Sequence, residues 1–282
     1  MFHVEQKKTY IEVIDHLLTK EKFKIKETAT AGLLKTDPTP TKKDIVKYYK
    51  SEKYVSHNSK NEGLFFFFYR LLRAVNFYSK YRLFSTINAN QNVLDFGSGE
   101  GYFLSKLQKK GFKTFGVEPT ASTTLPNILP SIFNRQLDGQ KFNYITAWHS
   151  VEHVHDLQKT VSRLHDLLDE KGTLLVAVPN YLSFDAKYYK SFWAAYDAPR
   201  HLWHFDKTSL KDIFKNNGFR FVKSSPMFLD AYYVSLLSES YKKSTFKIFK
   251  SILVGTTSNI LGLFTKEYSS NIFVFKKTKT NT

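Results

Sequence analysis

Three glycines and a nearby acid follow one short apolar run of the sequence, in an arrangement suited to binding a nucleoside. Residues 95–101 read Asp-Phe-Gly-Ser-Gly-Glu-Gly, directly after Val93 and Leu94. Glycine lets the backbone turn sharply and lets a ligand approach the main chain closely. Glu118 stands about 20 positions beyond Gly97, where a carboxylate can accept hydrogen bonds from both hydroxyls of a ribose. The sequence therefore predicts a site for an adenosine-containing cofactor.

The residue order in this loop argues against a dinucleotide. The dinucleotide fingerprint, G-x-G-x-x-G, requires glycine at position 102, which is Tyr102. Asp95 would repel a pyrophosphate, but its charge is favourable if the ligand is a cation with an ammonium group and a sulfonium. The P-loop pattern ending in G-K-[ST] is absent from the sequence.

Several segments, in the right order, resemble the class I S-adenosylmethionine-dependent methyltransferases. Residues 93–101 resemble the first motif of this family, and residues 116–118 resemble the second, which binds ribose. Residues 142–154 are similar to the fourth strand with its following loop, and residues 172–180 to the fifth strand. Residues 199–205, Pro-Arg-His-Leu-Trp-His-Phe, resemble a stretch common among bacterial small-molecule methyltransferases and the ubiquinone-biosynthesis O-methyltransferases.

The resemblance covers roughly residues 90–225 and the last strand. It implies that a methyl group passes from S-adenosylmethionine, leaving S-adenosylhomocysteine, to an oxygen or nitrogen of a small-molecule, lipid-linked or glycan-linked acceptor. One departure is Asn143, where the family usually has aspartate. Arg135 and Gln136 are the nearest, weak candidates for the contact with adenine. The predicted cofactor-binding residues are Asp95, Gly97, Ser98, Gly99, Gly101, Glu118 and Trp148.

Histidines near strand ends are the candidate catalytic groups. We propose His149 and His201 as acceptors of the proton that a methylated hydroxyl releases, because imidazole titrates near neutral pH. Structural hydrogen bonding in a packed loop is the alternative for each. His149, Glu152 and His153 also have the spacing of an inverted zinc-protease motif. That motif needs a helix, whereas this segment leaves a predicted strand, so no metal site is predicted.

Alternating strands and helices must position these residues. Such alternation implies a parallel sheet covered by helices on both faces. Together with the resemblance, it predicts an α/β, Rossmann-like doubly wound sheet of about seven strands with an antiparallel last strand. We expect strands at 93–96, 114–117, 142–148, 173–178, 219–222 and 272–275, and helices at 101–110, 157–168 and 208–217.

We divide the chain into two parts. Residues 1–62 form an N-terminal accessory arm, which contains a short strand at 23–26 and two prolines at 38 and 40. Residues 63–282 form the methyltransferase domain. Within it we expect a phenylalanine-rich capping helix at 64–86 and a helical insertion at 228–265, which shapes either the acceptor pocket or a dimer contact.

Composition excludes several classes of protein. The chain has 282 residues, of which 42% are hydrophobic and 24% charged, as in a globular protein. It has no cysteine, which excludes disulfides, thiolate catalysis and cysteine-bound metals. No run of about 18 apolar residues and no apolar leader stretch is present, so we predict a cytoplasmic protein without a membrane span.

The net charge of +17 is concentrated in two stretches. Residues 64–90 contain four basic and no acidic residues, and residues 228–282 contain eight lysines and three acids. Such faces suit a lipid headgroup, a nucleic acid or a phosphorylated substrate, although lysines also simply solubilise apolar surface. Two alternatives stay open: an RNA methyltransferase, and a non-enzymatic module that binds a membrane or partner and has a vestigial pocket. The oligomeric state is not predicted.

Overall fold

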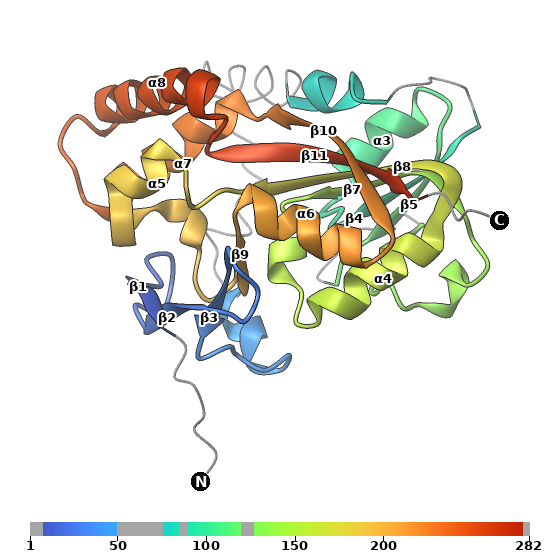
Figure 1. The fold of residues 1–282 in the computed structure, drawn as a ribbon, viewed down its shortest axis with the longest axis horizontal. Coiled ribbons are helices and arrows are strands. Elements are labelled where there is room, and N and C mark those ends of the chain that lie inside the picture. Colours follow the sequence, from blue (N-terminus) through green and yellow to red (C-terminus); the bar gives the residue numbers. More distant parts are fainter. Residues whose placement is uncertain (1–7, 50–75, 85–89, 120–126, 279–282) are drawn as a thin grey trace, which may run out of the picture.

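A seven-stranded sheet forms the centre of the computed structural model, which describes residues 8–49, 76–84, 90–119 and 127–278. The strand order is β10-β11-β8-β7-β4-β5-β6, and β11 is antiparallel to both of its neighbours (Figure 1). This confirms the predicted doubly wound sheet with an antiparallel last strand. The strands are β4 (Asn92–Phe96), β5 (Lys113–Val117), β6 (Ile128–Leu129), β7 (Phe142–Trp148), β8 (Leu168–Pro179), β10 (Phe219–Pro226) and β11 (Ser270–Lys277).

The strand order reverses at β4. The chain runs outward from β4 through β5 to β6, and then returns to the other side of β4 with β7 and β8. In open parallel sheets, ligands bind beyond the carboxyl ends of the strands at such a reversal. The loops that follow β4 and β7 are therefore the expected place for a ligand.

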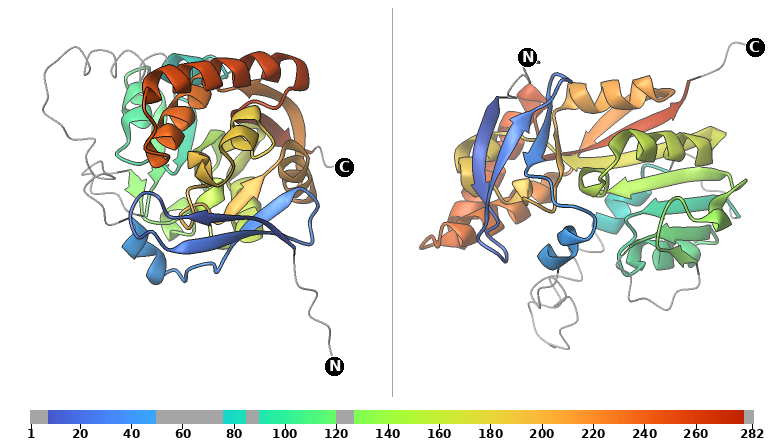
Figure 2. Two further views of the ribbon diagram at one scale, coloured as in Figure 1. Left: turned by 90° about the vertical axis from the view of Figure 1, so that its left-hand side faces the viewer. Right: turned by 90° about the horizontal axis from the view of Figure 1, so that it is seen from below.

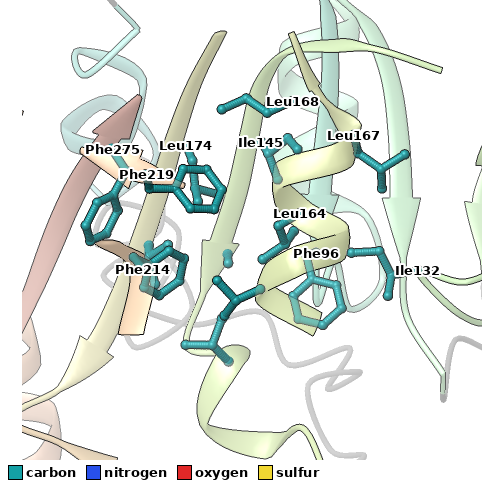
Figure 3. Packing of buried hydrophobic residues seen from close by; sticks show 14 of the residues in the cluster. Phe96, Ile132, Ile145, Leu164, Leu167, Leu168, Leu174, Phe214, Phe219 and Phe275 are labelled. Atoms are coloured by element: carbon teal, nitrogen blue, oxygen red, sulfur yellow. The ribbon is translucent and has the colours of Figure 1, made fainter. Parts of the chain in front are cut away.

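Helices cover both faces of the sheet. Leu94, Ile145 and Leu174 share one face with α4 (Leu157–Leu167) and α6 (Lys207–Asn216), in the core that Figure 3 shows from close by. The residues next to them in sequence, Val93, Tyr144 and Leu175, point to the other face, because side chains alternate along a strand. There they pack with α3 (Tyr102–Gln108) and with Phe77 and Phe84.

The arm forms a small antiparallel sheet that a strand of the methyltransferase domain completes. Its strands are β1 (Thr9–Ile14), β2 (Lys22–Glu27) and β3 (Leu33–Asp37), and β3 pairs with β9 (Trp203–Phe205) (Figure 2). Arg200, fully buried, contacts Asp15 of the arm at 2.8 Å and Asp197 at 2.7 Å. A buried charge is tolerated only when it is paired, so this contact ties the arm to the segment before β9.

The segment 228–265, predicted to be a helical insertion, contains two helices. They are α7 (Phe228–Tyr241) and α8 (Lys247–Thr265), which pack against each other and against α5 (Phe184–Tyr189). Residues 76–81 are helical within the predicted capping helix 64–86, most of which lies outside the described residues. Short 3-10 helices are η1 (Asp44–Tyr48), η2 (Arg135–Leu137), η3 (Val151–His153), η4 (Lys190–Phe192) and η5 (Ala194–Tyr196).

Candidate cofactor and acceptor site

The glycine loop lies between β4 and α3, at the carboxyl end of β4. Gly97, Gly99 and Gly101 all have left-handed backbone conformations, with φ of 80°, 51° and 75°. A Cβ on Gly97 would lie 2.1 Å from the Oγ of Ser150, so only glycine fits there. A Cβ on Gly99 would meet no atom within 4 Å. The backbone at Gly99 therefore faces open space, where a ligand can approach the main chain.

Glu118 lies beside this loop, as the sequence predicts. It follows β5 directly, and its Oε2 accepts a hydrogen bond from the Gly99 amide at 3.1 Å. The glycine loop and the carboxylate thus face the same space although they come from different strands. This is the arrangement that a ribose with two neighbouring hydroxyls requires.

Asp95 is buried near the end of β4, with only 2% of its surface exposed. Thr146, on the neighbouring strand β7, donates a hydrogen bond to its Oδ1 at 2.6 Å. Burial raises the pKa of Asp95 to about 7, although this hydrogen bond and the positive charge of Lys80 act in the opposite direction. A carboxylate that is costly to ionise is stabilised by any cation that binds beside it.

Lys80 belongs to the site although the sequence analysis did not single it out. It lies on the helical segment 76–81, and its Nζ is 4.6 Å from the centre of the Trp148 ring. Burial lowers the pKa of Lys80, while Asp230 and Asp95 attract its charge. The sequence analysis predicted a capping helix that includes this position. A predicted helix alone does not show which of its side chains face the glycine loop.

Two buried polar atoms near the loop have no hydrogen-bond partner among the described residues. They are the Oγ of Ser98, within the loop, and the Nε1 of Trp148, at the end of β7. An unpaired buried polar group costs free energy, so such atoms in a native protein usually serve a ligand or a water. S-adenosylmethionine offers carboxylate, ribose and adenine acceptors to both. The residues present therefore fit this cofactor.

His149 follows β7 directly and lies between two carboxylates. Its Nε2 is 2.9 Å from Oδ2 of Asp230 on α7, and its Nδ1 is 3.3 Å from Oε1 of Glu152. Burial alone would lower the pKa of His149, but Asp230 and Glu152 outweigh it and raise the pKa to about 9. His149 is consequently an imidazolium at neutral pH. In that form it donates hydrogen bonds through both ring nitrogens, and it accepts a proton only after losing one. The base role stays a prediction.

The backbone of His149 is unusual as well. Its φ is 52°, in the left-handed region that non-glycine residues rarely adopt. Such a conformation costs about 1 kcal/mol or more and persists where surrounding contacts impose it. Here the two carboxylates hold the side chain, and the amide of His149 donates to the carbonyl of Ala177 at 3.0 Å.

Glu152, His153 and His201 form a second cluster next to His149. One ligand atom from each lies within 4.8 Å of the others. Glu152 is 1% exposed, and neither of its carboxylate oxygens has a hydrogen-bond partner of good geometry among the described residues, the contact to His149 being an ion pair. Burial alone would raise the pKa of Glu152, but His149 and the other two histidines lower it.

Backbone carbonyls define the tautomers of the two histidines. Nδ1 of His153 is 3.0 Å from the carbonyl of Arg200, and Nδ1 of His201 is 2.9 Å from that of Ala195. A carbonyl only accepts, so the Nδ1 that faces it carries a proton in each histidine. Burial lowers the pKa of His201 to about 4, so His201 is neutral. The cluster therefore offers a carboxylate and two imidazoles as ligands for a divalent cation.

This cluster differs from the zinc motif that the sequence analysis considered. The spacing of His149, Glu152 and His153 suggested two histidines on one helix, whereas η3 is a single 3-10 turn. In the structure, His149 forms an ion pair with Asp230. The cluster instead contains His153 and, as its second histidine, His201 from the loop before β9. Pairing between such distant segments leaves no signal in residue spacing.

Comparisons with known proteins agree with this architecture. A family model described as a methyltransferase domain matches residues 66–224, while no curated protein matches the chain. Magnesium protoporphyrin IX methyltransferase from Synechocystis, solved with bound S-adenosylhomocysteine, has a TM-score of 0.52 at 14% identity and covers 84% of this chain and 100% of its own.

Two further solved structures are similar. The 1,6-didemethyltoxoflavin-N1-methyltransferase of Burkholderia thailandensis, with its acceptor and S-adenosylhomocysteine bound, has a TM-score of 0.50 at 14% identity, covering 91% of this chain and 96% of its own. Phosphoethanolamine N-methyltransferase 2 of Haemonchus contortus has a TM-score of 0.48 at 17% identity and covers 73% of this chain. This chain spans about half, 53%, of that enzyme's length.

Proposed function

The chain belongs to the methyltransferase-domain family, with S-adenosylmethionine as cofactor, and from this premise we propose that it methylates an oxygen or nitrogen of a small molecule, free or linked to a lipid or glycan. The observation that carries the proposal is the open main chain at Gly99, with Glu118 hydrogen-bonded to it and Asp95 buried beneath. Two of the similar structures with a TM-score of 0.50 or above act, by their names, on magnesium protoporphyrin IX and 1,6-didemethyltoxoflavin, which supports a small-molecule acceptor.

The cofactor side would use the predicted residues. Glu118 accepts hydrogen bonds from the ribose, and the Gly97–Gly99 backbone lies against the nucleoside. Asp95 compensates the positive charge of the methionyl part, and Trp148 donates from its free indole nitrogen. When bound, S-adenosylmethionine supplies a methyl group activated by its sulfonium. Among the described residues, Lys80 is the cation next to Trp148 and Asp95. When the cofactor binds, Lys80 either moves away from Asp95 or contacts an anionic group of the ligand.

The acceptor side would use the histidine cluster. His201, whose Nδ1 faces the carbonyl of Ala195, is proposed to accept the proton of a methylated hydroxyl at Nε2. Burial lowers the pKa of His201 to about 4, so it is neutral at pH 7 but a weak base. His149, charged and held by Asp230 and Glu152, is proposed to donate a hydrogen bond that orients the acceptor. Most of the rate would come from holding acceptor and methyl group in line and excluding water. A cytoplasmic location stays a prediction.

Calorimetric titration with S-adenosylmethionine, S-adenosylhomocysteine and NAD tests the cofactor. We expect micromolar affinity, on the order of 8 kcal/mol, for the two sulfur nucleosides and none for NAD. Asp95→Ala and Glu118→Ala should abolish this binding while circular dichroism stays unchanged. Wild-type affinity in both variants would contradict the proposal. With the cofactor established, labelled methyl transfer to fractionated small-molecule extracts identifies the acceptor.

A further inference from the structure

Helix α8 carries its small residues inward and its large apolar residues outward. The buried positions are Ser251, Val254, Gly255, Ser258 and Gly262. Phe249 is 68% exposed and Phe264 79% exposed. Other exposed apolar residues are Phe246, Ile248, Ile252, Leu253, Ile260, Leu261 and Leu263. This is the reverse of a helix that covers the core of a protein in water.

Packing explains the inward side of α8 but not the outward side. A Cβ on Gly255 would lie 2.7 Å from Cδ1 of Tyr232, and one on Gly262 would lie 2.5 Å from Cδ1 of Tyr268. Small residues are thus needed because α7 and the chain before β11 come close. Nothing among the described residues covers the opposite side, and so extended an apolar face indicates a binding surface.

Positive charge surrounds this apolar face. Lys242 and Lys243 are exposed between α7 and α8, Lys247 is exposed at the first residue of α8, and Lys266 is exposed directly after its end. The sequence of α8 contains no acidic residue.

The nearby acids do not offset these lysines. Glu239 is 1% exposed, Glu267 pairs with Lys207 at 2.7 Å, and Asp230 pairs with His149. These are the three acids of residues 228–282, and each faces the interior or a partner. The outer side of α8 is therefore both apolar and cationic.

We propose that α8 binds the surface of a bilayer that contains anionic lipid. Its apolar side chains enter the boundary between headgroups and acyl chains, and its lysines contact the headgroups. A second copy of the chain would fit worse, because pairing α8 with α8 sets lysines against lysines. By length and composition alone, α8 would also be long enough to cross a membrane, but 33% of it is buried within the protein, which favours lying along the surface.

The position of α8 links the surface to the acceptor side of the site, an argument that rests on the proposed function. Nδ2 of Asn259 donates to the carbonyl of Phe228 at 3.0 Å, which joins α8 to the first turn of α7. Two residues further, Asp230 holds His149. A bilayer bound at α8 is therefore one helix away from the acceptor side. An acceptor carried in the membrane suits this geometry better than a free solute.

Vesicle flotation of the full chain tests the surface. We expect binding to phosphatidylcholine vesicles that contain phosphatidylglycerol, weaker binding without it, and weakening by salt. The double substitution Phe249→Glu and Phe264→Glu should lower the partition coefficient about tenfold or more, because it places charge in the apolar layer. Val46→Glu, at an exposed apolar residue of η1, is the matched control and should bind as wild type.

The competing outcomes are distinct. Wild-type protein that ignores anionic vesicles, or a double variant that binds like wild type, would overturn the inference. So would a concentration-dependent dimer in sedimentation equilibrium that the double variant abolishes, since a second copy would then occupy α8. If the bound protein resists extraction by alkaline carbonate, α8 spans the membrane and does not lie on its surface, which would also overturn the inference. Calorimetry with S-adenosylmethionine on the same samples separates this surface from the proposed function, because either can fail while the other holds.

Discussion

The two sides of the site are assembled in different ways. The glycine loop and Glu118, which form most of the proposed cofactor side, come from residues 95–118, on two adjacent parallel strands. Trp148 joins them from the end of β7. The acceptor side gathers His149, His201 and Asp230 from the end of β7, the loop before β9, and α7. A short segment with repeated glycines can define a nucleoside site by itself. A site for a variable acceptor depends on contacts that only the complete fold brings together.

The charges of the two sides differ correspondingly. On the cofactor side, Asp95 is a carboxyl whose pKa burial raises to about 7, so it is ready to gain from a cation. On the acceptor side, carboxylates already hold His149 as a cation, and His201 is neutral. These charges suit the proposed roles, in which one side binds a positively charged cofactor and the other binds the acceptor. Four experiments separate them, from the largest expected effect to the smallest.

Loss of the ribose clamp should have the largest effect. We expect Glu118→Ala to weaken S-adenosylmethionine binding by more than about 100-fold, or roughly 3 kcal/mol, because two charge-assisted hydrogen bonds disappear. Glu100→Ala, at an exposed acid of the same loop, is the control and should retain wild-type affinity. Titration calorimetry measures both. Equal affinities in the two variants would show that the cofactor side does not depend on Glu118.

A substitution on the acceptor side should leave the cofactor untouched. We expect His201→Ala to lower kcat about 100-fold with an oxygen acceptor, because the proton acceptor is removed. The dissociation constant of S-adenosylmethionine should stay within about twofold of wild type. An acceptor nitrogen that is already unprotonated would need no base, so an unchanged kcat would favour N-methylation. Steady-state kinetics and calorimetry on one preparation give both quantities.

The raised pKa of Asp95 makes stability without cofactor depend on pH. The folded pKa lies above the ordinary value of 3.8, so its stabilising contribution is full below about pH 4 and is lost as pH rises toward 7. Asp95→Asn, which can still accept from Thr146, should therefore stabilise the free chain at pH 8. Near pH 4 the gain should vanish. Denaturant unfolding at both pH values checks this, and equal stabilisation at both would refute it.

Divalent cations should have the smallest effect, confined to the acceptor side. If Glu152, His153 and His201 hold a cation, a saturating concentration of zinc or manganese should stabilise the chain by about 1 kcal/mol. Thermal unfolding with and without each metal measures this. His153→Ala should remove the shift, whereas Glu118→Ala should keep it. No shift with any metal would leave the cluster a purely proton-handling role.

Sequence alone predicted the sheet well because its signals are local. The predicted strand 142–148 coincides with β7, and the glycine loop and Glu118 meet as expected. The strand predicted at 173–178 begins earlier, at Leu168 in β8. The first residues of β8 are mostly polar, so they do not show the apolar pattern of a buried strand. Their backbone nevertheless reaches β7, where Leu168 pairs with Phe142.

The acceptor side was only partly predictable. His149 and His201 were identified as candidates, but the carboxylate that sets the charge of His149 is Asp230, 81 residues away. Pairing of β3 with β9 likewise joins residues 33–35 to residues 203–205. Such contacts depend on how whole elements pack, and one sequence carries no periodic pattern that reports them.

The buried ion pair between Arg200 and Asp15 links the arm to the loop that carries His201, so the two segments have to be kept together during evolution. Arg200 also donates to the carbonyl of Tyr48, so two parts of the arm satisfy its guanidinium. Deleting the arm would remove two of these partners and leave Asp197 as the charged partner of Arg200, which directly precedes His201 in the chain. Gene fusion or domain exchange that replaced the arm alone would therefore disturb catalysis first. In a chimera, the arm and the 199–205 loop have to be transplanted together.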